Sequence, residues 1–121
     1  MKLLNYINGT LQEPLKGQWL DNIEPATGAV YSYIPDSDAS DMQAAVNAAT
    51  EAYPAWSATD AAERSRIMLR IAELIDENLE RLAQAESQDN GKPVALAKVM
   101  DIPRAASNMR FFATAILHQS T

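Results

Sequence analysis

Residues 4–34 carry strand and turn signals, and their hydrophobic and polar positions alternate, imperfectly, with the period of two that is typical of β-strands. Residues 4–7 precede Asn8-Gly9, and both turn residues tolerate the positive φ angles that a two-residue type I′ turn requires. Residues 19–23 and 29–34 form a second pair of short apolar segments, with a proline and a glycine between them. The pattern therefore predicts two successive β-hairpins.

From Asp38 onwards, the apolar positions recur at helical spacing. Asp38 or Ser37 can cap this first helix, and Asp41 places negative charge near the positive end of its dipole. Pro54 should end or kink the helix, because proline has no backbone N–H to donate.

A continuous apolar stripe predicts a second and longer helix. This helix should begin at Thr59 or Asp60, where Glu63 can complete a capping box. It should end at Asn90-Gly91, because glycine adopts the left-handed conformation of a C-terminal cap without steric cost. The stripe consists of Ile67, Met68, Ile71, Leu74, Ile75, Leu79 and Leu82.

A third helical region is predicted over residues 94–118, with an interruption at Ile102-Pro103. The expected fold class is α/β, locally α+β, with N-terminal β-hairpin strands followed by three amphipathic helices. We expect a β-hairpin region at residues 1–37 and a helical region at residues 38–121. Because an isolated two-stranded hairpin is marginally stable and exposes its edges, the pattern indicates an incomplete piece of a larger fold.

The net charge of −6, carried by dispersed acidic residues, argues against a nucleic-acid-binding protein. No apolar run approaches the roughly 18 residues of a membrane helix, and the N-terminus lacks the features of a secretory signal. These features lead us to expect a cytoplasmic protein. The 121 residues contain no cysteine, which excludes disulfides, thiolate metal sites and a cysteine nucleophile among them.

Few residues of this chain are candidates for chemistry. The single histidine, His118, lies two residues from Ser120 near the chain end, and this proximity alone does not predict a triad. We interpret acidic residues such as Asp76 as solvent-exposed. Arg104 and Arg110 lie six positions apart on one predicted helix and so point in different directions. Each can hold a substrate carboxylate or pair with a neighbouring acid.

Several motifs in colinear order resemble the opening segment of the aldehyde dehydrogenases. Residues 6–9 are similar to the family's (F/Y)I(N/D)G opening, and residues 22–30 are similar to its NPATGEV turn, with glutamate where asparagine is commoner. Within this family, the chain most resembles the 2-aminomuconic and 2-hydroxymuconic semialdehyde dehydrogenases. The other similar segments are residues 44–56, 62–67 and 86–93 for the family, and residues 83–87, 100–104, 110–113 and 117–118 for the semialdehyde group.

The resemblance implies an N-terminal portion of an enzyme that oxidises an aldehyde, such as a muconic semialdehyde, to its carboxylic acid with NAD or NADP. A cysteine thiolate would attack the aldehyde, a glutamate would activate water, and an asparagine side chain would help to stabilise the oxyanion. In the family, these residues and the nucleotide-binding loops lie beyond the matching segment. We therefore assign no catalytic and no cofactor-binding residue here, and we expect this chain alone to be inactive.

The resemblance also implies a dimer or tetramer of identical subunits. One alternative is a stand-alone α+β interaction or assembly module descended from such an enzyme. Another is one half of a split enzyme, whose second chain supplies the missing C-terminal part.

The resemblance to the family also implies two sites in this chain, one for a cation and one for the substrate carboxylate. A monovalent cation would be held by the backbone carbonyls of Asn22 and Ile23 and by the carboxylate of Asp101. Alternatively, Asp101 caps the helix that restarts at Pro103. In the semialdehyde group, an arginine binds the substrate carboxylate, and we expect Arg110 in this role, with Arg104 second.

Overall fold

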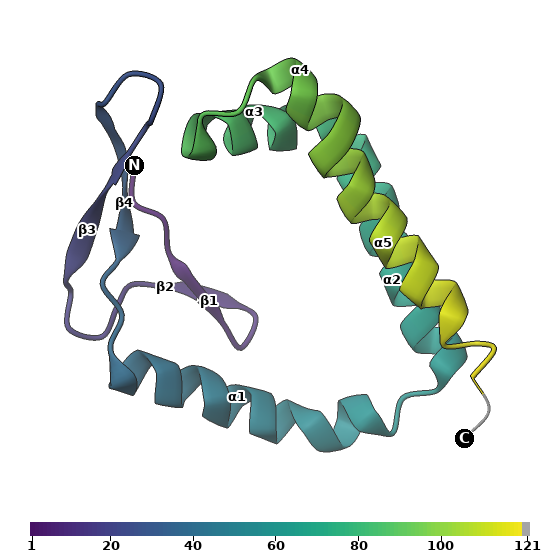
Figure 1. Cartoon of the computed structure of the whole chain (residues 1–121). Coiled ribbons are helices and arrows are strands. Elements are labelled where there is room, and N and C mark those ends of the chain that lie inside the picture. Colours follow the sequence, from purple (N-terminus) through teal and green to yellow (C-terminus); the bar gives the residue numbers. More distant parts are fainter. Residues whose placement is uncertain (120–121) are drawn as a thin grey trace. The chain divides into compact units, whose positions relative to one another are not determined.

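The computed structural model describes residues 1–119, so Ser120 lies outside the described residues. By its internal contacts the chain divides into two compact units, Met1–Ala58 and Thr59–Thr121. The first unit carries the strands and one helix, and the second unit is helical (Figure 1). The predicted order of strands followed by helices is confirmed. The division at residues 37 and 38 stays a prediction about the larger fold.

Both predicted hairpins form in the first unit. Strands β1 (Asn5–Ile7) and β2 (Thr10–Gln12) pair antiparallel, and so do β3 (Trp19–Ile23) and β4 (Val30–Pro35). Asn8 and Gly9 have φ angles of 52° and 76°, as the predicted turn requires. The two hairpins form separate two-stranded sheets, and the N-terminal residues pair with β4, where the Leu3 amide donates to the Tyr33 carbonyl at 2.8 Å.

Helix α1 (Ala39–Ser57) begins at the predicted cap, Asp38, which forms a capping box with Asp41. Asp38 is the N-cap residue, and its side chain accepts a hydrogen bond from the Ser40 amide, while the Asp41 side chain accepts one from the Asp38 amide. Pro54 lies inside the last turn, and the helix continues to Ser57 before it ends. Because proline has no N–H to donate to the Thr50 carbonyl, the helix lacks one hydrogen bond just before its end.

Asp41 also anchors the loop that connects β2 to β3. Its side chain is only 5% exposed. Its Oδ1 accepts a hydrogen bond of 2.8 Å from the Leu15 amide, and its Oδ2 accepts one of 3.0 Å from the Asp38 amide. Both carboxylate oxygens therefore accept a hydrogen bond, so neither is buried without a partner.

The predicted second helix is divided at Asn78 into α2 (Ala61–Glu77) and α3 (Leu79–Asn90). The Asn78 side chain donates to the Leu74 carbonyl at 2.8 Å, and this local bond competes with continuation of the helix. The expected capping box at Asp60 is wrong, because no side-chain hydrogen bond caps α2 there. Glu63 instead binds Arg66. The predicted cap at Gly91 is confirmed, with φ of 80°.

The predicted third helix consists of a short α4 (Val94–Leu96), a π-helical turn η1 (Ala97–Asp101) and α5 (Ile102–Ala115). The interruption is therefore a change of helix type just before Pro103, where the Ile102 amide donates five residues back to the Ala97 carbonyl. The interpretation of Asp101 as a helix cap is wrong, because its side chain makes no capping hydrogen bond.

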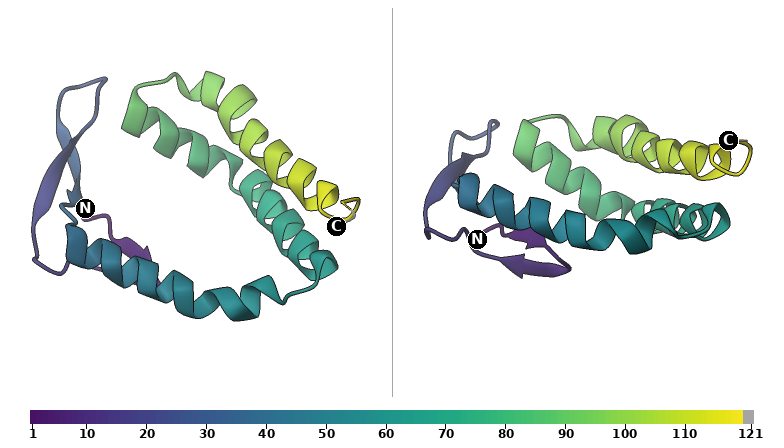
Figure 2. Two further views of the ribbon diagram at one scale, coloured as in Figure 1. Left: turned by 60° about the horizontal axis from the view of Figure 1, so that its bottom comes forward. Right: turned by 90° about the horizontal axis from the view of Figure 1, so that it is seen from below.

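Helices α2 and α5 lie side by side and antiparallel in the second unit (Figure 2). Among the described residues of this unit, the buried apolar side chains are all alanines, which let helix axes approach closely. Larger apolar residues stay exposed, such as Leu74 at 42% on α2 and Phe111 at 64% on α5. A helix usually buries its apolar face, so these exposed residues support the prediction of an incomplete fold. The buried alanines are Ala72, Ala83, Ala97, Ala106 and Ala113.

Among the described residues, no helix is both long enough and apolar enough to cross a membrane.

Candidate functional site

Arg110 lies on α5 and pairs with Asp76 on α2. The two side chains are 44% and 49% exposed, so water still reaches both groups. Asp76 is thus half-exposed, as the sequence suggested, but its carboxylate is not free. The ion pair links the two helices and engages the guanidinium that we expected to bind substrate.

Arg104 lies six residues earlier on the same helix and is exposed. It makes no hydrogen bond or ion pair with any residue that the structure describes. Phe111 follows seven positions later and therefore lies on the same face of α5. The ring of Phe111 packs edge-to-face on that of Phe112, with 5.1 Å between their centroids. Arg104 is thus an available guanidinium on a helix face that also carries an exposed aromatic ring.

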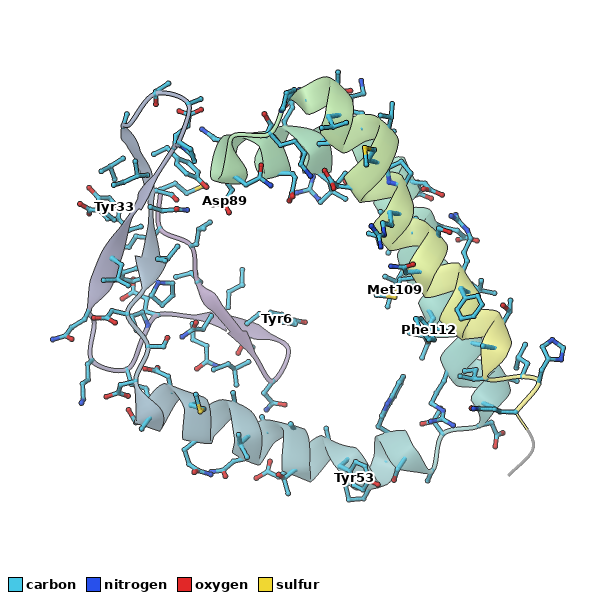
Figure 3. All side chains as sticks on the ribbon, viewed as in Figure 1. Tyr6, Tyr33, Tyr53, Asp89, Met109 and Phe112 are labelled. Carbon is cyan, nitrogen blue, oxygen red and sulfur yellow. The ribbon has the colours of Figure 1, made fainter. Side chains whose placement is uncertain are left out.

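Aromatic and sulfur-containing side chains also project from α5. Met109 and Phe112 lie three positions apart, on neighbouring turns of the helix (Figure 3). Phe112 is 56% exposed. An available guanidinium and exposed apolar side chains are thus present on the same helix.

Asp101, the last residue of η1, pairs with Lys92. The distance between Lys92 Nζ and Asp101 Oδ2 is 2.6 Å, and the side chains are 32% and 29% exposed. The Lys92 amide is also held, by a hydrogen bond of 2.8 Å to Asn90 Oδ1. The negative charge of Asp101 is therefore already compensated from within the chain.

The other two residues predicted for a cation site, Asn22 and Ile23, lie on β3 in the first unit. The side-chain nitrogen Nδ2 of Asn22 donates to the hydroxyls of Tyr31 and Ser32, at 2.9 and 3.1 Å. Within the described part of the chain, no three histidine, cysteine or acidic side chains gather as metal ligands. Asp101 pairs with Lys92 in this structure, and the cation site stays a prediction.

A second lysine, Lys98, links the π-helical turn η1 to α3. Lys98 Nζ in η1 lies 2.5 Å from Glu80 Oε2 on α3. The hydrogen bond from Lys98, followed by one from Gln84, lowers the pKa of the Glu80 carboxyl. This ion pair keeps η1 against α3 independently of Lys92.

Comparison with known proteins identifies the fold. The family model described as the aldehyde dehydrogenase family matches residues 12–121. The chain belongs to the aldehyde dehydrogenase family. It is 46% identical over all of its 121 residues to the 2-aminomuconic semialdehyde dehydrogenase of Bos taurus and 44% identical to that of Homo sapiens. It covers 24% of each of these relatives, so it spans about a quarter of their length.

Two solved structures have a similar backbone over this segment. The crystal structure of PnpE in complex with nicotinamide adenine dinucleotide has a TM-score of 0.92 and 38% identity, over 94% of this chain and 23% of that chain. A putative aldehyde dehydrogenase from Burkholderia cenocepacia has a TM-score of 0.95 and 39% identity, over 100% of this chain and 25% of that chain. The predicted fold class, a piece of the aldehyde dehydrogenase fold, is confirmed.

Sequence reasoning singled out the two arginines and Asp101 but missed their partners. Lys92 belongs to the Gly-Lys-Pro motif, and its charge was the one available signal that it could pair with an acid. Asp76 is 34 residues from Arg110, and only the packing of α2 on α5 brings them together.

Proposed function

We propose that these residues form the N-terminal part of an NAD(P)-dependent aldehyde dehydrogenase whose substrate aldehyde carries a carboxylate, as a muconic semialdehyde does. The reaction consumes the aldehyde, water and the oxidised nicotinamide and yields the carboxylic acid, the reduced nicotinamide and a proton. Family membership supports the reaction class. The similarity to the 2-aminomuconic semialdehyde dehydrogenases of Bos taurus and Homo sapiens supports the substrate class, and the NAD complex of PnpE supports the cofactor.

We further propose that Arg104, rather than Arg110, binds the carboxylate of the substrate. The observation that carries this proposal is the contrast between the two side chains. Arg110 already pairs with Asp76, whereas Arg104 has no partner among the described residues. A guanidinium can donate two parallel hydrogen bonds to a carboxylate, and such charge-assisted bonds are about twice as strong as neutral ones.

In this proposal, the chain supplies substrate recognition and structure, and the nicotinamide accepts a hydride when it is bound. No cysteine is present among the 121 residues, so the nucleophile must come from polypeptide outside them. The 121 residues alone should therefore show no NAD-dependent aldehyde oxidation. The alternative of a stand-alone interaction module is not favoured. The whole chain aligns with a segment that makes up about a quarter of each of the two semialdehyde dehydrogenases.

The test uses a chimera in which this chain replaces the matching quarter of the Bos taurus 2-aminomuconic semialdehyde dehydrogenase. Steady-state kinetics would compare 2-hydroxymuconic semialdehyde with 2-hexenal, a neutral six-carbon aldehyde. Arg104→Ala should raise KM for the carboxylated aldehyde roughly 10- to 100-fold, which corresponds to the loss of about 1.5–3 kcal/mol of charge-assisted hydrogen bonding. KM for 2-hexenal should stay unchanged.

Arg110→Ala is the matched control, because it removes the same side chain from the same helix. We expect it to change KM for the two aldehydes equally and by little. A selective loss with Arg110→Ala and none with Arg104→Ala would reverse the assignment. No selective loss with either variant would remove α5 from carboxylate recognition.

We also propose a cytoplasmic homo-oligomer. The absence of cysteine is compatible with a reducing compartment. Exposed apolar side chains on the strands, such as Leu20 at 48% and Ile23 at 52%, support association with further polypeptide. Analytical ultracentrifugation of the chimera would test the oligomer, and a monomer at micromolar concentration would count against it.

A further inference from the structure

Arg104 has an acidic neighbour that could neutralise it. Asp101 precedes it by three residues, and the backbone of both Asp101 and Ile102 is right-handed helical, with φ/ψ of −70/−51° and −69/−47°. Side chains three positions apart lie next to each other on a helix, and an aspartate and an arginine at this spacing attract each other. An internal ion pair would therefore compete with any carboxylate that Arg104 binds.

The structure shows a different pairing. The Asp101 carboxylate lies against Lys92 at 2.6 Å, and Arg104 stays unpaired among the described residues. Lys92 follows Gly91, which ends α3, and the next residue is a proline, so its backbone cannot continue the helix. The π-helical turn η1 then leads back to Asp101. The turn between α3 and α5 thus holds an ammonium group beside this carboxylate.

We propose that Lys92 is a positioning residue that engages Asp101 and thereby keeps the Arg104 guanidinium available for the substrate carboxylate. This inference rests on the proposed role of Arg104. Two physical effects act together. Lys92 prevents Asp101 from pairing with Arg104, and its positive charge cancels the repulsion that a bare Asp101 would exert on an approaching carboxylate.

The proposal predicts a pattern that a merely structural ion pair would not give. Lys92→Met leaves Asp101 without its partner, so Asp101 turns to Arg104. KM for 2-hydroxymuconic semialdehyde should rise about three- to tenfold, with KM for 2-hexenal unchanged. Asp101→Asn removes the competitor itself and should leave both KM values near those of the parent. The double variant, Lys92→Met with Asp101→Asn, should therefore recover the KM that Lys92→Met lost.

The control is Lys98→Met in the same turn, which removes a lysine paired with Glu80 rather than with Asp101. It should not change the ratio of the two KM values. Measurements use the chimera described above, and circular dichroism checks that each variant is folded. If Lys92→Met alone is insoluble, Lys92→Gln is measured in its place.

The outcomes separate this inference from the proposed function. If Arg104→Ala has no selective effect, the proposed function fails. If Arg104→Ala is selective but Lys92→Met and Asp101→Asn raise KM equally, the ion pair has only a structural role and the inference is overturned. It is also overturned if the double variant does not recover the KM for the carboxylated aldehyde.

Discussion

Replacing Asp41 by alanine should release the loop that precedes β3 from the start of α1. Asp41 is 5% exposed and accepts one hydrogen bond from the Leu15 amide and one from the Asp38 amide. Hydrogen bonds to a charged group contribute about 1.5–3 kcal/mol each. Because the two bonds share one side chain and are only partly buried, we expect Asp41→Ala to cost about 2–4 kcal/mol rather than the full sum.

Native-state hydrogen exchange followed by NMR reports on these two amides directly. The loss of about 2–4 kcal/mol in Asp41→Ala should accelerate exchange at the Leu15 amide roughly 30- to 1,000-fold. Asp41→Asn keeps an oxygen acceptor for one of the two donors, so its effect should be intermediate. Asp36→Ala is the matched control, because it removes an exposed aspartate close by in the sequence.

The control should change exchange by less than the equivalent of about 0.5 kcal/mol. If Asp41→Ala accelerates exchange at Leu15 no more than Asp36→Ala does, the carboxylate does not hold the loop. The energetic account of the first unit would then be wrong.

Three further predictions concern charged groups. The hydrogen bond from Lys16 holds the pKa of Asp38 well below its usual range, so this carboxylate stabilises the folded chain at neutral pH and loses that effect as the pH falls below about 4. Urea unfolding at pH 6 and pH 3 should show this loss, and Asp38→Asn should make it smaller. Asp76→Asn should lower the free energy of unfolding by less than about 1 kcal/mol, because the pair with Arg110 is half-exposed; a larger loss in urea unfolding would contradict this reading. Exchange of sodium for choline at constant ionic strength should leave the melting temperature unchanged, whereas a drop of several degrees would indicate a cation at Asp101.

The hairpins and the start of α1 could be predicted because their signals are local. Asn8-Gly9 supplies both positive φ angles, and Asp38 with Asp41 forms a capping box within four residues. The end of α3 at Gly91 follows in the same way from the properties of glycine. In each case, the interactions that decide the structure join residues that are close in the sequence.

The division of the second helix was missed because its apolar stripe continues past Asn78, although asparagine favours caps and turns over helix interiors. Pro103 predicted an interruption of the third helix. It did not predict that the interruption is a π-helical turn or that this turn spans Ala97–Asp101.

The candidate site depended on contacts that the sequence does not show. In our proposal Arg104 precedes Arg110 as the candidate, because α2 packs on α5 and brings Asp76 to Arg110. The partner of Asp101 depends on how the chain turns between α3 and α5. Such pairings depend on tertiary structure, so neither spacing nor motif could reveal them.

The most direct test of the central claim is the activity of the chimera itself. The chimera is purified and supplied with NAD, and NADH formation is followed with 2-hydroxymuconic semialdehyde and with 2-hexenal. The account predicts turnover of both aldehydes, with the higher kcat/KM for the carboxylated one, and none from the 121-residue chain alone. A folded chimera that binds NAD but prefers the neutral aldehyde would contradict the claim that this chain helps to select a carboxylated substrate.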